Sequence, residues 1–366
     1  MTSQETVTPA RPYIGGQALL EGVMMRSPTS FAMVVRRADG SLVVRERAMV
    51  DERKGFAKLP FVRGVTSLVE SLKLGNEALR FSVDQLQKDL DAADAVKKVG
   101  PGLSMLSAFG YSLFLLATGD GGGEATGASE KKRSMGPMLL IMVAFMVALP
   151  QLGAVGLAKL FHLDLAVQSA GFQALTGSVK LAIVLGYLLL IRRVPDIRRV
   201  FQYHGAEHKT ISTYEAQEPL DVAHARAKTT LHPRCGTTFL VMVVLVSIAM
   251  FTVLGAVLPR IDTGSAVRDN ILFFILKLPF LPVLVALTFE LQRIFARYCT
   301  TGPLRLLLVP GFLVQRITTI EPDDDQLEVA LASLGATLQR EHGKAGESAT
   351  ESSYPTFEAA AKALEA

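Results

Sequence analysis

Two histidines and a glutamate are close together in the stretch "YHGAEHKTISTYEAQEP", residues 203–219. If 201–217 is helical, a rotation of about 100° per residue places them on one face. Two imidazoles one helical turn apart can bind one cation. The spacing therefore predicts a metal site, and the face that carries it contains His204, Glu207, His208, Ile211, Glu215 and Glu218.

The order of these residues also fits the H-x-x-E-H pattern, in which the glutamate is a base that acts on a metal-bound water. This pattern predicts His204 and His208 as ligands and Glu207 as the catalytic base. Only three residues define it, so an alternative stays open. In that alternative the helix lies at a membrane surface, and its polar residues pair with Lys209 or with the arginines of 192–199.

A second cluster, "LHPRCGTT" (231–238), comes directly before a long apolar run. Cys235 is expected at the N-terminal end of a helix, where the positive dipole lowers the pKa of a thiol. Histidine and cysteine thiolate are preferred zinc ligands, and catalytic zinc keeps one position open. The predicted set is His204 and His208 with His232 or Cys235, holding a divalent metal such as zinc. The alternatives for Cys235 are a small buried residue and a nucleophile with a histidine base.

The composition is that of a polytopic membrane protein. Hydrophobic residues make up 49% of the 366, and the mean hydropathy is +0.33. A mainly α fold with about four transmembrane helices is predicted, plus a small N-terminal β-rich cytoplasmic unit. The predicted spans are 136–158, about 176–192, 236–258 and 271–292. Pro279 and Pro282 should kink the last span. The shorter run 103–118 is predicted to be interfacial or re-entrant, with a true span as the alternative.

Basic clusters flank these runs at 130–133, 192–199 and 292–298. By the positive-inside rule, they place both termini and the segment 193–235 in the cytoplasm of a multi-pass inner (plasma) membrane protein. Their position favours membrane lipids as partners over nucleic acid. The two cysteines, Cys235 and Cys299, are too few for a disulfide scaffold. The sequence does not predict an oligomeric state.

The remaining segments form the predicted domain boundaries. Residues 1–10 are expected to be disordered. Segment 11–60 is expected to form the β unit, with a hairpin at Asp39-Gly40 and tight turns at Gly15-Gly16 and Gly22. Segment 61–118 is expected to hold amphipathic and interfacial helices, 119–135 a flexible linker, and 136–300 the four-helix membrane domain. Segment 301–342 is expected to hold an interfacial stretch and an amphipathic helix, and 343–366 a disordered tail.

Three further residues are weaker candidates for substrate binding. Glu290 is a carboxylate at the end of an apolar run, and either a role near the metal or an ion pair with Arg293 explains it. Arg26 and Glu21 lie in the glycine-rich N-terminal stretch, where an arginine can bind a phosphate headgroup.

Four pieces of the chain resemble the YqhQ-like family of bacterial membrane proteins. They are "GGQALLEGVMMRSP", "YHGAEHKTISTYE", "LHPRCGTTFL" and "PGFLVQRITTIEPDDDQLEVALASL", in family order. The resemblance implies a predicted metal-dependent enzyme of unknown function. It also implies that His204, Glu207, His208, His232 and Cys235 are signature positions. The glycine-rich insertion at 118–134 departs from the family pattern.

Three functions remain open on this basis. The first is a metal-dependent hydrolase at the cytoplasmic bilayer face, acting on a lipid-linked molecule or a membrane-protein segment. The second is a non-catalytic membrane factor whose structural metal site supports partner recruitment. The third is a transporter, against which the few spans and the absence of a visible inverted repeat argue.

Overall fold

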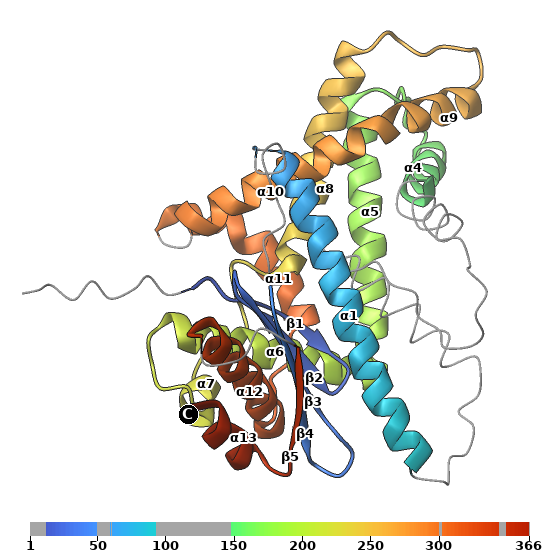
Figure 1. The fold of residues 1–366 in the computed structure, drawn as a ribbon. Helices are drawn as coiled ribbons and strands as arrows, with labels where there is room; N and C mark the ends of the chain where they lie inside the picture. Colours follow the sequence, from blue (N-terminus) through green and yellow to red (C-terminus); the bar gives the residue numbers. More distant parts are fainter. Residues whose placement is uncertain are drawn as a thin grey trace, which may run out of the picture.

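The chain is described by a computed structural model that covers residues 12–49, 59, 61–92, 148–299, 302–343 and 349–365. Within these ranges the fold is mainly helical, as predicted, with one five-stranded sheet. Figure 1 shows the sheet and its covering helices at one end of the molecule and the long apolar helices at the other. Helix α6 (Pro195–Glu215) shares one apolar cluster with the sheet and with the end of the apolar helix α5 (Ala170–Ile191).

The sheet is an antiparallel meander in the order β1-β2-β3-β4-β5. Its strands are β1 (Gly15–Leu19), β2 (Gly22–Arg26), β3 (Ser30–Arg36), β4 (Leu42–Ala48) and β5 (Thr350–Tyr354). The predicted hairpin at Asp39-Gly40 is confirmed, with Gly40 at a φ of 87°. The predicted tight turn at Gly15-Gly16 is wrong, because both glycines lie in β1. At Gly22 the prediction is confirmed, since Gly22 pairs with Leu19 and closes the tight turn at Leu20 and Glu21.

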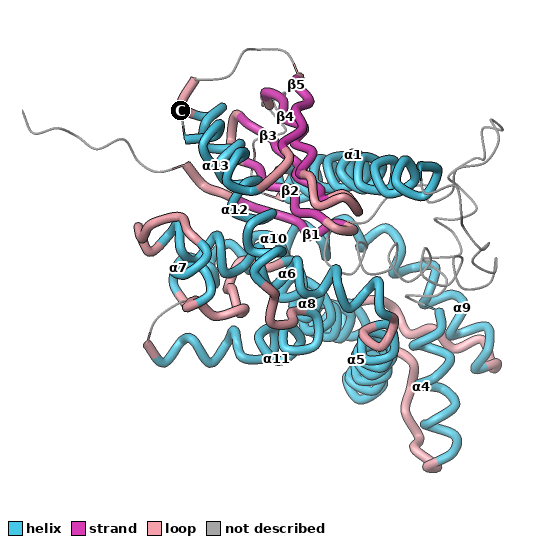
Figure 2. The backbone as a smooth tube through the Cα atoms, turned by 90° about the horizontal axis from the view of Figure 1, so that it is seen from below, coloured by secondary structure: helices cyan, strands magenta, loops and turns pink. Residues whose placement is uncertain are grey.

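Both faces of the sheet are covered, which explains why β3 is buried at nearly every position. One face packs against α6 (Pro195–Glu215) and α12 (Asp324–Glu341), through residues such as Val23, Val34 and Leu327. The other face packs against α1 (Val62–Ala92), where Phe31 meets Phe81 in a second apolar cluster. Figure 2 shows α1 and α12 on opposite sides of the strands. The amphipathic helices predicted within 61–118 and 301–342 are confirmed as α1 and α12, and both cover the sheet.

The prediction of a disordered tail after residue 343 is wrong for residues 350–365. Strand β5 pairs with the free edge of β4, and α13 (Phe357–Glu365) packs against α12 with Ala360 fully buried. Strand β5 is polar and mostly exposed, so its sequence resembles that of a solvated tail. Its stability comes from backbone pairing with β4, and composition does not report such pairing.

Three helical segments are long and apolar enough to cross a membrane, which suggests a membrane protein. They are α5 (Ala170–Ile191), α8 (Gly236–Val257), and the segment Val267–Tyr298. The last contains α9 (Ala266–Lys277) and α10 (Leu281–Tyr298), separated by the 3-10 helix η3 (Leu278–Phe280) at the predicted prolines. Of the predicted span 136–158, only its C-terminal part is described, and α4 (Leu149–Leu160) begins there. The predicted 1–10, 103–118 and 119–135 segments lie outside the described residues.

Helix α1 is fixed against α10 by a bidentate ion pair. Arg63 Nε donates to Glu290 Oε1 at 2.7 Å, and Arg63 Nη2 donates to Oε2 at 2.5 Å. One residue along, Gly64 is buried against Phe289, and a Cβ there would lie 3.0 Å from the Phe289 Cβ. The ion pair explains Glu290, with Arg63 rather than Arg293 as the partner. Helix α1 therefore closes one side of the space between the sheet and the apolar helices.

Candidate functional site

Helix α6 carries three of the predicted site residues, and it is buried on nearly all sides. His204 is 5% exposed, Glu207 6% and His208 1%. Strand β1, helix α12 and the segment 318–321 surround the helix. The alternative of a solvated helix at a membrane surface is therefore wrong. A buried helix with this many polar residues requires specific partners for each of them.

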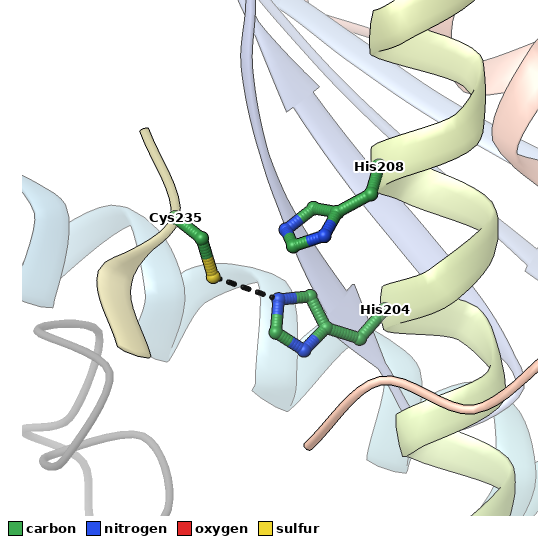
Figure 3. A group of neighbouring side chains, drawn as sticks. All are labelled: His204, His208 and Cys235. Atoms are coloured by element: carbon green, nitrogen blue, oxygen red, sulfur yellow. Dashed lines mark hydrogen bonds between the residues drawn. The ribbon is translucent and has the colours of Figure 1, made fainter. Parts of the chain in front are cut away.

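Three of the predicted ligands meet at one point. One nitrogen each of His204 and His208 and the Sγ atom of Cys235 lie within 4.8 Å of one another, and all three residues are buried. Figure 3 shows both imidazoles projecting from α6 toward Cys235. Cys235 is the N-cap of α8, where its Sγ accepts from the Thr237 backbone nitrogen. The prediction that Cys235 begins a long helix is confirmed, and the start of that helix faces the histidines.

Backbone carbonyls hold both imidazoles in the tautomer that a metal ligand needs. His204 Nδ1 donates to the Thr318 carbonyl at 2.9 Å, and His208 Nδ1 donates to the Thr230 carbonyl at 2.5 Å. Since a carbonyl oxygen only accepts, the proton is on Nδ1 and the lone pair is on Nε2. Metal-bound histidines show this arrangement. In the structure the Nε2 atom of His204 lies 3.2 Å from Cys235 Sγ. This donor set fits a divalent metal such as zinc.

His232 is adjacent to this cluster but has a different partner. Its ring centroid is 5.7 Å from that of His208, while its Nε2 lies 3.3 Å from Glu215 Oε2. Glu215 also pairs with Arg234. Of the two alternatives for the third ligand, the structure therefore brings Cys235, and not His232, into the group with His204 and His208.

Glu207 lies in the same cavity as the cluster, next to strand β1. Glu207 can lie this close to β1 only because residue 16 is a glycine. A Cβ at that position would lie 2.7 Å from Glu207 Cγ. This contact explains the glycine that the sequence suggested was part of a turn. The cavity has a volume of about 660 Å³ and contains all five signature residues.

Burial favours the neutral form of His208 and His232. The pKa of His232 is lowered to about 4 by burial. The pKa of His208 is also lowered, by burial first and then by the neighbouring His204 and His232. Neutral imidazole is the form that binds a metal, so these histidines are in the ligand form at neutral pH.

These lowered values predict that acid destabilises the metal-free protein. Below the unfolded value of about 6.5, the unfolded chain binds protons that the folded His232 does not bind. The free energy of unfolding should therefore be flat above pH 7 and should fall between pH 6.5 and about 4. The fall due to His232 is on the order of 3 kcal/mol. Unfolding of the chelator-treated protein at pH 7.5, 6 and 5 measures this slope.

His232→Gln should reduce the slope and leave the part due to His208, whereas the same change at the half-buried His224 of α7 (Val222–Arg226) should not alter it. Equal slopes for the two variants would contradict the assignment of this acid sensitivity to His232.

The weaker candidates separate into two groups. Arg26 lines the cavity, where its Nη2 donates to Ser71 Oγ at 3.2 Å. Glu290 is bound to Arg63, which lines the cavity. Glu21 does not line the cavity. It has a positive φ of 53°, and it is bound to Arg199 and Tyr203 on α6. Glu21 therefore fixes the β1–β2 turn to α6 instead of contacting a ligand.

Sequence reasoning missed several residues of the site because they are remote along the chain. No local sequence pattern indicates these residues. They are Thr230 and Thr318, whose carbonyls bind the imidazoles, Gly16, which allows Glu207 to lie close to β1, and Gln315, which links two segments. Gln315 lies on α11 (Val309–Thr318), which follows the 3-10 helix η4 (Pro303–Leu308). Its Nε2 donates to the His232 carbonyl at 2.7 Å and to Thr238 Oγ1 at 2.8 Å. It thereby joins the Cys235 loop to α11.

Comparison with known proteins supports the resemblance carried by these motifs. Residues 59–340 match a family described as "Protein of unknown function (DUF1385)". The chain is also 29% identical over 338 residues to "Uncharacterized protein YqhQ" of Bacillus subtilis (strain 168), covering 90% of this chain and 93% of that protein. No solved structure matches. The chain therefore belongs to the YqhQ-like DUF1385 family.

Proposed function

We propose that the protein is a multi-pass inner-membrane enzyme that binds a divalent metal, zinc, at His204, His208 and Cys235. The observation that supports this most is the convergence of three buried ligand atoms within 4.8 Å. The two carbonyl contacts at Nδ1 add to it, because they orient both rings for binding through Nε2. Both termini are proposed to be cytoplasmic, in line with the basic residues next to the apolar helices.

The proposed reaction is hydrolysis at the cytoplasmic face of the bilayer. Three protein ligands leave one position open, as in catalytic zinc sites. A bound divalent metal supplies Lewis acidity at this point. Glu207, buried in the same cavity, is proposed to accept a proton from water at its carboxylate oxygen and to return it to the leaving group. Burial of the surrounding α6 residues keeps bulk water away from that carboxylate.

A second candidate follows from the position of His232. Its ring is close to that of His208, so a rearrangement could add a fourth ligand and close the site. A closed set of four protein ligands is typical of structural zinc. The protein would then be a non-catalytic membrane factor that recruits partners.

Metal analysis of purified variants distinguishes these functions. Wild-type protein in detergent, prepared without chelator, should hold one metal ion per chain. His208→Ala should lose it, Glu207→Gln should keep it, and His224→Ala, outside the site, should behave as wild type. Cells that carry only the Glu207→Gln protein should show the phenotype of a deletion strain.

Absence of metal from the wild type would overturn the metalloenzyme proposal. Full activity of Glu207→Gln in cells would overturn the catalytic role and leave the structural site as the explanation.

A further inference from the structure

The cavity that contains the His/Cys cluster is much larger than a metal and a water require. Its volume is about 660 Å³, whereas one water occupies roughly 30 Å³. Its walls come from β1, β2, α1, α6, α8 and α10, and from the loop before α8. A cavity of this size accommodates an organic ligand.

The lining is strongly cationic. Among the described lining residues there is one carboxylate, Glu207, against five arginines: Arg26, Arg63, Arg234, Arg293 and Arg297. Arg63 is paired with Glu290 and Arg234 with Glu215. Even when these two carboxylates are counted, the arginines exceed the carboxylates by two. The cavity therefore favours an anionic ligand.

The remaining arginines, Arg26, Arg293 and Arg297, form no salt bridge within 4 Å to a carboxylate in the described part of the chain, and Arg293 interacts with Glu290 only at longer range. Arg26 donates only to Ser71, and Arg293 and Arg297 are exposed on the last turns of α10. The planar guanidinium group binds phosphate through two parallel hydrogen bonds, which makes arginine a preferred phosphate ligand. Such groups at a cavity wall point to a phosphate as the anion.

A buried amide supplies an independent indication of a ligand. Gln17 on β1 lines the cavity and is only 3% exposed. Neither its Oε1 nor its Nε2 has a hydrogen-bond partner among the described residues. Leaving a buried polar group unpaired costs on the order of 1–3 kcal/mol. A polar ligand in the cavity would satisfy this amide.

Apolar side chains also line the cavity, some of them from the long apolar helices. Phe239 lies on the first turn of α8, and Phe289 lies on α10 next to the arginines. Leu68 of α1 lines the same space. A ligand that contacts both the arginines and these side chains needs a charged head and an apolar chain.

We infer that this cavity binds a phosphate-bearing lipid, with the phosphate at the α10 and β2 arginines and the chain along Phe239 and Phe289. The inference deepens the proposed function by naming the substrate class of the same site, and as a substrate assignment it rests on that function. An acidic polypeptide would use the arginines but would leave the apolar wall unmatched.

The chain contains no tryptophan, so Phe239→Trp creates a single fluorescent reporter in the cavity wall. The full-length protein in detergent is titrated with dioctanoyl phosphatidic acid, with dioctanoylglycerol as the uncharged control and with inorganic phosphate as the headgroup control. The titration is repeated in Arg293→Gln/Arg297→Gln. The matched control is Arg193→Gln/Arg198→Gln, which changes two exposed arginines outside the cavity. Metal content is measured in every sample.

Phosphatidic acid should bind at least about 10-fold more tightly than either control ligand. The Arg293/Arg297 variant should lose about 10-fold in affinity, the control variant should match the wild type, and metal content should not change. Equal binding of dioctanoylglycerol, or no effect of the Arg293/Arg297 variant, would overturn the inference. Equal affinity for inorganic phosphate, or displacement by poly-glutamate, would overturn the assignment to a lipid. If the wild-type protein binds the lipid but contains no metal, the lipid inference is supported and the proposed metal-dependent function is overturned.

Discussion

Replacing Gly205 with alanine is expected to lower the free energy of unfolding by about 1–3 kcal/mol, the usual range for overpacking, and to weaken metal binding. Gly205 lies on α6 between His204 and His208, and a Cβ there would lie 2.2 Å from the Ile320 carbonyl oxygen. The Ile320 nitrogen donates to the Phe201 carbonyl at 2.9 Å, which holds this backbone against the helix. The contact cannot be relieved by rotating a side chain.

The effect should reach the proposed metal site, because the displaced segment includes Thr318, whose carbonyl orients His204. The intrinsic helix preference for alanine over glycine, about 1 kcal/mol, opposes the loss. Gly186→Ala on α5 isolates that preference, because nothing lies within 4 Å of the added Cβ. Thermal unfolding and metal content are compared for the two variants. If Gly205→Ala is as stable as Gly186→Ala and keeps its metal, the close packing of α6 on 318–321 is refuted.

Replacing Cys235 with serine is expected to reduce zinc affinity by at least about 100-fold while the fold is retained. Loss of a hydrogen-bond partner of a ligand typically costs 10–100-fold in affinity, so loss of the ligand itself should cost no less. Serine keeps the second role of this residue, because a hydroxyl also accepts from the Thr237 nitrogen at the start of α8.

Cys235→Ala separates the two roles. It removes both the ligand and the N-cap, so it should lose zinc and also about 1 kcal/mol of stability relative to Cys235→Ser. Cys299→Ser, at the other free and buried cysteine, is the matched control and should retain zinc. Zinc affinity by competition with a chelator dye and thermal unfolding measure the two effects. Unchanged zinc affinity in Cys235→Ser would exclude Cys235 as a ligand.

The local elements of the fold were predictable because their signals are local. The hairpin at Asp39-Gly40 and the amphipathic helices α1 and α12 follow from turn chemistry and apolar periodicity. The long apolar helices follow from composition, and the break in the last one follows from Pro279 and Pro282. The tail after residue 343 was mispredicted, since β5 is held by pairing with a strand that is 306 positions away at Arg45 and Glu351.

The same distinction holds for the candidate site. By itself the sequence determined which residue types are available, because His204, Glu207 and His208 share one helical face at fixed spacing, and Cys235 precedes an apolar run. Only the tertiary structure decided that Cys235 rather than His232 joins the two histidines, since Glu215 holds His232 apart. It also decided that α6 is buried and that arginines from β2, α1 and α10 line the same cavity. The physical reason is that helix spacing is fixed within one segment, whereas contacts between segments depend on how the whole chain packs.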